Sequence, residues 1–472
     1  MNNRWNFQIE LTADNQSKPV YLELANAIQR TISCGILKEG EMLPSSREMA
    51  SQLGLSRKTI VKAMEILQLK GYLYAKDRVG LFVAKPSGLT DPPFPQAKTT
   101  QKEIHAVGGP LLKVNDGFPD TRLLPFLEFT RAYRKLFNRA AQWKSLGYNE
   151  PTGYPKFRQA IATMLSHSRS LAINDQELCV VRGSQMALYL VAHAVLQRGD
   201  HVAIESPGYQ NAYDAFQAAG LVIHTIPVDA EGIDVTQLAQ LCQSEPIRAV
   251  YLTPRHQYPT TVKLSLPRRR RIKELAEQFG FLVIEDDFGA DFQFSGQRLL
   301  PLSSMLDKAH TIYIGTFSKI FAPAIRIGYV ISSTETIKKI AAYRQLIDIQ
   351  GDTVQEHALC EMMDNGLLTR HIRRSMKIYR ERLAFATQEI QRVLGTSVGY
   401  RPPHSGLALW FTLPSSLTEA TLRAQLANKG IVLPIFHLAD GTLGVRIGYA
   451  SLTKEELSRL IGELGKILTY TA

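Results

Sequence analysis

A change in composition and hydrophobic pattern near residue 86 constrains the fold of this chain more than any other feature. The stretch 86-PSGLTDPPFPQAKTTQKE-103 is rich in proline, threonine and glycine and has no hydrophobic period, which is typical of a linker. Before it the chain is short and helical, whereas strands alternate with helical stretches after it. The sequence therefore predicts a small domain over 1–86, a linker over 87–109 and a large α/β domain over 110–472.

Composition narrows the classes of protein that fit this layout. A chain of 472 residues with 45% hydrophobic residues is long enough for a large core and a smaller module. We expect a cytoplasmic protein without a membrane segment, because no apolar run approaches a membrane span and the N-terminus lacks a signal-peptide pattern. The net charge of +12 favours an acidic partner, with nucleic acid the leading candidate and DNA, RNA and anionic lipid left open.

The four cysteines have no metal-ligand spacing, which argues against both disulfides and a zinc site. They are Cys34, Cys179, Cys242 and Cys360. We accordingly predict no metal in this protein.

The small domain has the pattern of a helix-turn-helix. Apolar residues at helical spacing predict a first helix that ends near Gly35. The stretch 44-PSSREMASQLG-54 predicts a second helix closed by Gly54, and 55-LSRKTIVKAMEILQLKG-71 a third with Ser56 as its N-cap. The turn between the last two helices is very short, and 72-YLYAKDRVGLFVA-84 predicts two strands around a basic turn, which is a wing.

Basic residues in the first turn of the third helix suit contact with DNA, since a recognition helix presents its N-terminal residues to base edges. The alternative is that these charges form a solvated helix face. The stretch LPSSREMASQLGLSRKTIVKAMEILQLKGYLY is similar to the GntR-type winged helix, although the wing tip departs from that family's Gly-x-Gly-Thr-like turn. The expected DNA-contacting residues are Arg47, Ser56, Arg57, Lys58, Thr59, Arg78 and Gly80.

In the large domain, polar residues follow several predicted buried strands. Lys319 comes just after the strand 311-TIYIG-315, and Asp286 stands at the end of the apolar stretch that begins at Phe281. Tyr209 follows a strand that begins at His201. Ligands in open α/β sheets bind outside the carboxyl ends of the strands, so these side chains are expected to meet in one crevice.

A lysine, a carboxylate, an aromatic plate and a helix start that binds anions are the groups that pyridoxal 5'-phosphate (PLP) requires. Lys319 would form the Schiff base, Asp286 would keep the pyridine nitrogen protonated, and Tyr209 would stack on the ring. The predicted phosphate cradle consists of Ser184, Gln185, Thr316, Ser318 and Arg326. The alternatives are a solvated loop lysine and, at 285–287, a metal site, for which no histidine or oxygen partner can be placed.

The order of these segments resembles the fold type I aminotransferases along roughly residues 110 to 472, with a mostly parallel central sheet. The stretch 147-GYNEPTGYPKFRQAI-161 resembles an early segment of that family. By the same resemblance, 253-TPRHQYPT-260 places Gln257 at the cofactor's phenolic oxygen, and 443-LGVRIGYA-450 makes Arg446 the clamp for an effector carboxylate. A buried structural arginine is the alternative at that position.

A GntR-type module followed by a linker and an aminotransferase-like domain is the layout of the MocR/GabR family of bacterial transcription regulators. This resemblance implies a head-to-tail homodimer that binds double-stranded operator DNA and senses an amine, an amino acid or PLP itself. Two departures from members of that family are Phe288, where they place a tyrosine, and Asn211, where the GABA-sensing members place an arginine. GABA is therefore an unexpected ligand.

Two classes of function fit the sequence. In the first, a regulator, exchange of an amine at the cofactor changes the dimer and so biases operator binding. In the second, a transaminase, the same site turns over and the DNA-binding module is accessory. The winged helix favours the regulator, because a plain aminotransferase has no use for a DNA reader.

Overall fold

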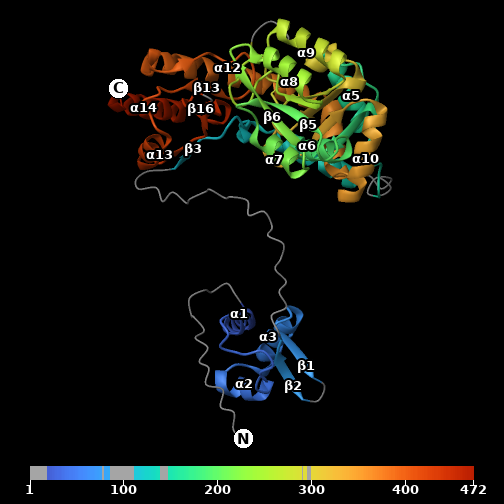
Figure 1. The fold of residues 1–472 in the computed structure, drawn as a ribbon, viewed down its shortest axis with the longest axis vertical. Coiled ribbons are helices and arrows are strands. Elements are labelled where there is room, and N and C mark those ends of the chain that lie inside the picture. The colour runs from blue at the N-terminus through green and yellow to red at the C-terminus, as the bar shows by residue number, and fades with distance from the viewer. Residues whose placement is uncertain are drawn as a thin grey trace. The chain divides into compact units, whose positions relative to one another are not determined.

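The computed structural model describes residues 19–76, 79–84, 111–138, 147–289, 291–294, 299–438 and 440–471 (Figure 1). The chain forms two compact units that divide between residues 103 and 104, and each is described by itself. The predicted linker over 87–109 lies outside the described residues. None of the described helices is long and apolar enough to cross a membrane.

The first unit is a three-helix bundle with a hairpin. Its elements are α1 (Val20–Ser33), α2 (Ser46–Leu53), α3 (Arg57–Leu69), β1 (Leu73–Lys76) and β2 (Gly80–Val83). The side chain of Ser56 accepts a hydrogen bond from the backbone N–H of Thr59 and caps α3. Gly54, with φ of 64°, closes α2 in the left-handed conformation that the tight turn requires. The predicted helix-turn-helix with its wing is confirmed.

The second unit is built on an eight-stranded sheet with the order β4-β11-β10-β9-β8-β5-β6-β7. Among the described strands of this sheet, only β11 and β7 run against their neighbours, so the predicted mostly parallel sheet is confirmed. The strands are β4 (Leu178–Val181), β5 (His201–Ser206), β6 (Val222–Asp229), β7 (Gly232–Ile233), β8 (Ile247–Leu252), β9 (Leu282–Asp286), β10 (Thr311–Thr316) and β11 (Gly328–Ile331).

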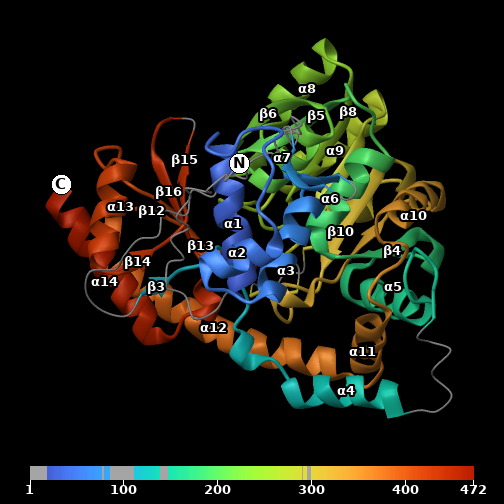
Figure 2. The same ribbon diagram turned by 90° about the horizontal axis from the view of Figure 1, so that it is seen from below.

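Helices cover both faces of this sheet (Figure 1). One buried cluster joins the sheet to α6 (Gly183–Ala194), α7 (Gln210–Ala218) and α10 (Thr334–Asp348). A second cluster joins the other face to α8 (Val235–Ser244) and α9 (Leu266–Phe279). A third contains α5 (Pro155–Arg169) and α11 (Thr353–Asp364), and α4 (Phe126–Asn138) lies beside α11 (Figure 2).

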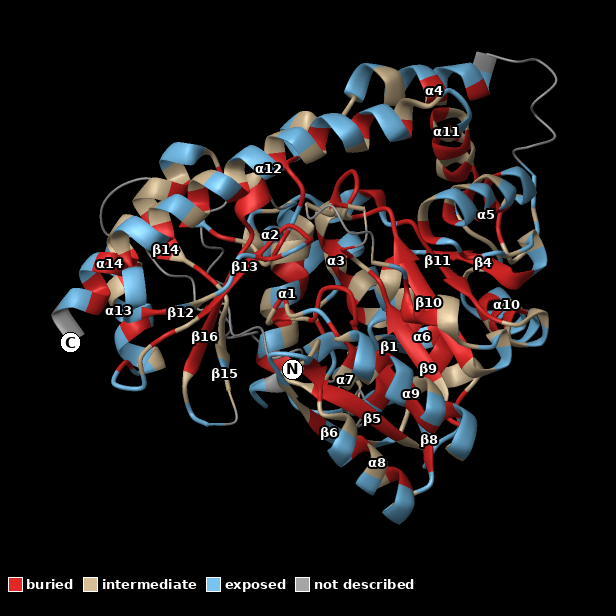
Figure 3. Cartoon of the chain, turned by 90° about the horizontal axis from the view of Figure 1, so that it is seen from above, coloured by how far each residue is buried: buried red, intermediate tan, exposed pale blue. Residues whose placement is uncertain are grey.

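The C-terminal part forms a separate layer of helices over a small sheet, in which the two central strands are buried and the outer helix surfaces exposed (Figure 3). Its helices are α12 (Leu367–Val393), α13 (Glu419–Asn428) and α14 (Lys454–Thr471). Its sheet has the order β12 (Gly399–Tyr400), β13 (Leu409–Thr412), β16 (Leu443–Ile447) and β15 (Ile435–His437). A parallel pair of β14 (Ile431–Val432) with β3 (Leu112–Lys113) ties residues 111–118 to this layer.

Short 3-10 helices complete the connections. They span Thr121–Leu123, Asp175–Glu177, Leu302–Met305, Lys308–His310, Pro323–Ile325, Gly395–Ser397 and Tyr449–Ser451. The turn at Pro323–Ile325 ends on Arg326, whose φ of 47° is unusual for a residue with a side chain.

Candidate functional site

A cavity of about 790 Å³ opens at the carboxyl ends of the sheet strands. Most of the residues predicted to hold a cofactor line this one cavity. They are Ser184, Gln185, Tyr209, Asp286, Thr316, Ser318, Lys319 and Arg326. Segments that lie far apart in the sequence therefore supply one site, as expected for the crevice of an α/β sheet.

Lys319 presents a buried amine to this cavity from the turn after β10. Its Nζ donates a hydrogen bond to the carbonyl oxygen of Gly117 at 3.1 Å and lies 4.7 Å from the centre of the Phe118 ring. Burial lowers the pKa of Lys319 to about 8, an effect that the charge of Asp116 opposes. About half of the amine is then neutral at pH 8 and can act as a nucleophile.

Three successive carboxylates at the end of β9 have three different surroundings. Side chains alternate along a strand, so Asp286 points away from its two neighbours. Glu285 accepts hydrogen bonds from the backbone N–H groups of Leu302 and Ser303, at 3.0 and 2.7 Å. Asp287 is paired with two buried guanidinium groups, those of Arg255 and Arg169, and its pKa is lowered although burial alone would raise it. Glu285 and Asp287 are each engaged by other groups of the protein. Of the three carboxylates, Asp286 is the one that lines the cavity.

Asp286 itself is buried and only partly satisfied. One carboxylate oxygen, Oδ2, accepts a hydrogen bond from the hydroxyl of Tyr251 at 3.1 Å, whereas Oδ1 has no hydrogen-bond partner among the described residues. Burial raises the pKa of Asp286 to about 7, and the hydrogen bond from Tyr251 works in the opposite direction. A protonated ring nitrogen facing Oδ1 would satisfy this acceptor and hold it ionised.

A corner suited to a phosphate lies at the start of α6. The first turn of α6 offers backbone N–H groups that lack helical partners, and Ser184 lies within it. The guanidinium of Arg326 lies beside Gly183, where a Cβ atom would come within 3.2 Å of it. The Ser318 hydroxyl is buried with no partner among the described residues. Ser184, Ser318 and Arg326 line the same cavity, and donors of this kind suit a phosphate dianion.

Tyr209 forms one wall of the cavity at the start of α7. Its hydroxyl accepts a hydrogen bond from Asn211 at 3.0 Å, and its ring meets Tyr258 edge to face at 5.2 Å between centroids. These contacts fix the ring, so that it presents a flat aromatic surface to a planar ligand.

Two residues predicted for the site do not line the cavity. Gln257 is buried; its amide nitrogen donates to backbone carbonyls, including that of Pro207, and its amide oxygen accepts from the backbone N–H and hydroxyl of Thr260. Gln257 therefore holds its own turn together, and its contact with a cofactor oxygen stays a prediction. Arg446 is also buried, and its Nε donates to the carbonyl oxygen of Asp116 at 2.7 Å. Arg446 lies behind the cavity wall.

The sequence did not predict that several other residues would line the cavity or contact its residues. Asp116 and Phe118 reach the site because the β3–β14 pair holds their segment there. Tyr258 lines the cavity and donates a hydrogen bond to Asp116 at 3.0 Å, while Phe436 enters from β15. Tyr251 lies inside β8, where an aromatic residue is ordinary core, so its contact with Asp286 was not predictable.

The N-terminal unit carries the residues predicted to contact DNA. Arg47 is exposed at the start of α2, and Arg57 and Lys58 are exposed at the start of α3, where the Arg57 Nε donates to the Ser46 hydroxyl at 3.3 Å. Ser56 and Thr59 bond to each other and cap the helix start. Gly80 begins β2 and is exposed, and Arg78 lies outside the described residues.

Comparison with known proteins agrees with both units. Residues 112–464 match the family "Aminotransferase class I and II", and residues 20–83 match "Bacterial regulatory proteins, gntR family". The chain is 29% identical to the pyridoxine biosynthesis transcriptional regulator PdxR of Corynebacterium glutamicum over 94% of both chains. It is 26% identical to the probable rhizopine catabolism regulatory protein MocR of Rhizobium meliloti, over 94% of this chain and 93% of that one.

A solved structure shows the same large fold with a ligand. The α-aminoadipate aminotransferase LysN of Thermus thermophilus, complexed with N-(5'-phosphopyridoxyl)-L-leucine, is 26% identical with a TM-score of 0.70. The match covers 76% of this chain and 92% of that chain.

Fold and site together define a PLP-binding domain of the aminotransferase type fused to a DNA-binding winged helix. The chain belongs to the aminotransferase class I and II family and carries a GntR-type reader domain, the arrangement of MocR/GabR-type regulators. PLP is its cofactor, since the partly satisfied Asp286, the buried Ser318 hydroxyl and the buried amine of Lys319 fit that group. When bound, PLP supplies an aldehyde that condenses with amines and a ring that withdraws electrons.

Replacement of Asp286 by asparagine should have opposite effects on the empty and loaded protein. A carboxyl ionises near pH 4 in the unfolded chain but near 7 in the folded one, so wild-type stability falls as pH rises through that window. Without cofactor, Asp286→Asn should therefore gain stability relative to wild type between pH 5 and 8, by on the order of 4 kcal/mol. With PLP, the same variant should bind more weakly. Thermal unfolding and PLP titration measure both, and equal pH profiles would contradict this assignment.

Loss of Arg57 should weaken DNA binding. Arg57→Ala should lower operator affinity by about 1–3 kcal/mol if the side chain contacts a base edge, and affinity should fall steeply with salt as counterions are released. Fluorescence anisotropy with operator DNA at several salt concentrations measures both effects. Arg271→Ala removes the same charge from the large unit and should change little. Unchanged affinity in Arg57→Ala would rule out the contact.

Proposed function

We propose that this protein is a cytoplasmic transcription regulator in which an amine or amino acid that reaches Lys319 changes affinity for operator DNA. The observation that carries the proposal is the presence of a DNA reader and an amine-reactive pocket in one chain. A ligand that binds the pocket can alter DNA affinity only if it binds two states of the protein unequally. The cavity residues named above are the proposed cofactor ligands, and Lys319 is the residue proposed to react.

Arg446 supports a ligand that carries one carboxylate. Its guanidinium is buried and has no carboxylate within ion-pair distance among the described residues, since its partners are backbone carbonyls and His256. Burial accordingly lowers the pKa of Arg446. A buried, unpaired cation is costly, and a ligand carboxylate would relieve that cost. A ligand carboxylate in the cavity can reach Arg446 only after a small movement of the Asp116 segment, which separates Arg446 from the cavity.

Position 211 limits the ligand to one acid group. Asn211 lines the cavity where an arginine would supply a second clamp, and its side-chain amide donates to the hydroxyl of Tyr209. A dicarboxylate would leave one acid group unpaired in the pocket. An amino acid with a single carboxylate, or PLP alone, therefore fits better.

A catalytic transaminase is the second candidate, because the pocket keeps a lysine, a ring-nitrogen carboxylate and an aromatic stack. Phe288 lines the cavity and has no hydroxyl, so it offers the cofactor's phenolic oxygen no hydrogen bond. We expect this loss to disfavour repeated turnover. The two candidates differ in whether keto acid accumulates.

A homodimer is part of the proposal. Leu346 is 83% exposed at the end of α10, and Ile347 and Ile349 beside it are also exposed. On α4, Phe126 and Leu127 are exposed as well. Exposed apolar patches of this kind mark interfaces, and a head-to-tail dimer is the arrangement that the family resemblance implies. Sedimentation at several protein concentrations tests the dimer.

The proposed function is tested by three measurements on the same sample. Holoprotein is mixed with amino acids, and the cofactor absorption, keto-acid formation and affinity for operator DNA are measured together. We expect at least one monocarboxylic amino acid to change both the spectrum and DNA affinity with at most trace keto acid. The matched control is the corresponding amine without the carboxylate, which should act more weakly because it cannot pair with Arg446.

The opposite pattern would overturn the proposal. Sustained turnover at about 1 per second or faster, with DNA affinity indifferent to the substrate, would identify an enzyme. Equal responses to an amino acid and its decarboxylated amine would remove Arg446 from the ligand site.

A further inference from the structure

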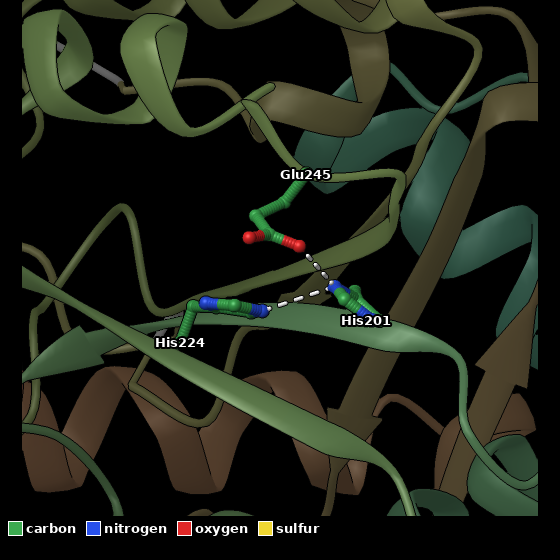
Figure 4. A group of neighbouring side chains, drawn as sticks. All are labelled: His201, His224 and Glu245. Atoms are coloured by element: carbon green, nitrogen blue, oxygen red, sulfur yellow. Dashed lines mark hydrogen bonds and ion pairs between the residues drawn. The ribbon is translucent and has the colours of Figure 1, made fainter. Parts of the chain in front are cut away.

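Two histidines and a glutamate converge on one point of the large unit away from the cavity residues (Figure 4). The Nδ1 atom of His201 lies 3.2 Å from Nε2 of His224 and 3.1 Å from Oε2 of Glu245. One ligand atom from each of the three lies within 4.8 Å of the others. None of these residues lines the cofactor cavity.

The sheet fixes this cluster. His201 begins β5, His224 lies in β6, and Glu245 follows the last turn of α8 just before β8. In the parallel β5–β6 pair, Ala203 stands opposite His224, so His201 and His224 project from the same face of the sheet. The register of β5 against β8 shifts between His201 and Val202, a local irregularity that re-aims side chains. The three groups therefore come from rigid elements at the amino ends of strands.

The contacts around His201 Nδ1 exceed what one proton can supply. A ring nitrogen either carries one hydrogen and donates it, or accepts one. If Nδ1 donates its one hydrogen to Glu245, no hydrogen is left for the lone pair on Nε2 of a neutral His224. If His224 donates to Nδ1 instead, the Glu245 carboxylate faces a lone pair. A cation placed between the three groups satisfies all three at once.

The geometry resembles that of a tetrahedral metal site. Zinc binds histidine nitrogen and carboxylate oxygen at about 2.0–2.2 Å, so two ligand atoms on a tetrahedral ion lie about 3.3 Å apart. The two separations from His201, 3.1 and 3.2 Å, match that spacing. The side chains of His201 and Glu245 are 23% and 38% exposed, which leaves an entry path and room for water as a fourth ligand.

We propose that His201, His224 and Glu245 form a binding site for a divalent late transition metal of the zinc class. The ion would tie β5, β6 and the α8–β8 connection together at the edge opposite the strand ends that hold the cofactor residues. The proposal does not depend on the proposed regulatory function. It revises the sequence prediction that the protein binds no metal, which rested on cysteine spacing and on the carboxylates at 285–287.

The test is zinc binding by untagged full-length protein that has been stripped with a chelator. All variants carry Cys34→Ser, because Cys34 is an exposed thiol that would itself bind zinc. Competition with a chromophoric chelator gives the affinity, and cobalt substitution reports four-coordinate geometry through visible absorption. We expect one tight site in the parent protein, and His224→Gln and Glu245→Gln should each weaken zinc binding at least about tenfold.

The matched control is the exposed pair of His437 and Glu419, whose Nε2 and Oε2 lie 2.6 Å apart. This pair has no third ligand group among the described residues, so His437→Gln should leave zinc affinity unchanged. Zinc should raise the melting temperature of the parent but not of Glu245→Gln. This comparison does not need the histidine variants, so it remains valid if one of them folds poorly. Equal zinc binding by all the proteins, or a cobalt spectrum without tetrahedral bands, would overturn the proposal.

Discussion

The alternation of side chains along β9 is the constraint on which the candidate site depends. Three carboxylates in a row at the buried end of a strand would repel one another if they shared a face. The pleat sends Glu285 and Asp287 to one side, where backbone N–H groups donate hydrogen bonds to Glu285 and two arginines pair with Asp287. Asp286 is left on the cavity side with the hydroxyl of Tyr251 and an oxygen that no described residue satisfies. The site thus keeps one carboxylate facing the cavity, beside a buried ionic network.

The remaining parts of the site follow from the same sheet edge. The turn after β10 brings Lys319 to the cavity, and the start of α6 faces Arg326 across Gly183. The C-terminal layer contributes through the β3–β14 pair, which holds Asp116 and Phe118 over the lysine. Burial lowers the pKa of Lys319 to about 8, and Gly117 and Phe118, which contact the amine, contribute to that burial. A movement of the C-terminal layer would therefore change both the reactivity of the Lys319 amine and the distance between that amine and Arg446.

Residues at the end of a buried strand or within a few residues after it were predictable from sequence, because strand ends in a parallel sheet meet at one edge. Lys319, Asp286 and Tyr209 are of this kind. Gln257 and Arg446 were assigned by resemblance alone, and their surroundings depend on carbonyl oxygens of distant loops, which no local pattern encodes. The cluster at His201 was invisible for a similar reason. His201 and His224 meet through the register of β5 and β6, and the α8–β8 connection adds Glu245.

The most direct test of the site is to locate the amine that carries the cofactor. Borohydride reduction of the PLP-loaded protein, followed by proteolysis and mass spectrometry, shows which lysine carries the cofactor. The assignment of Lys319 as that amine predicts a yellow protein whose label lies in the peptide that contains Lys319, and no label in that peptide for Lys319→Ala. A label on another lysine, or a wild-type protein that stays colourless and unlabelled after reconstitution with PLP, would contradict it.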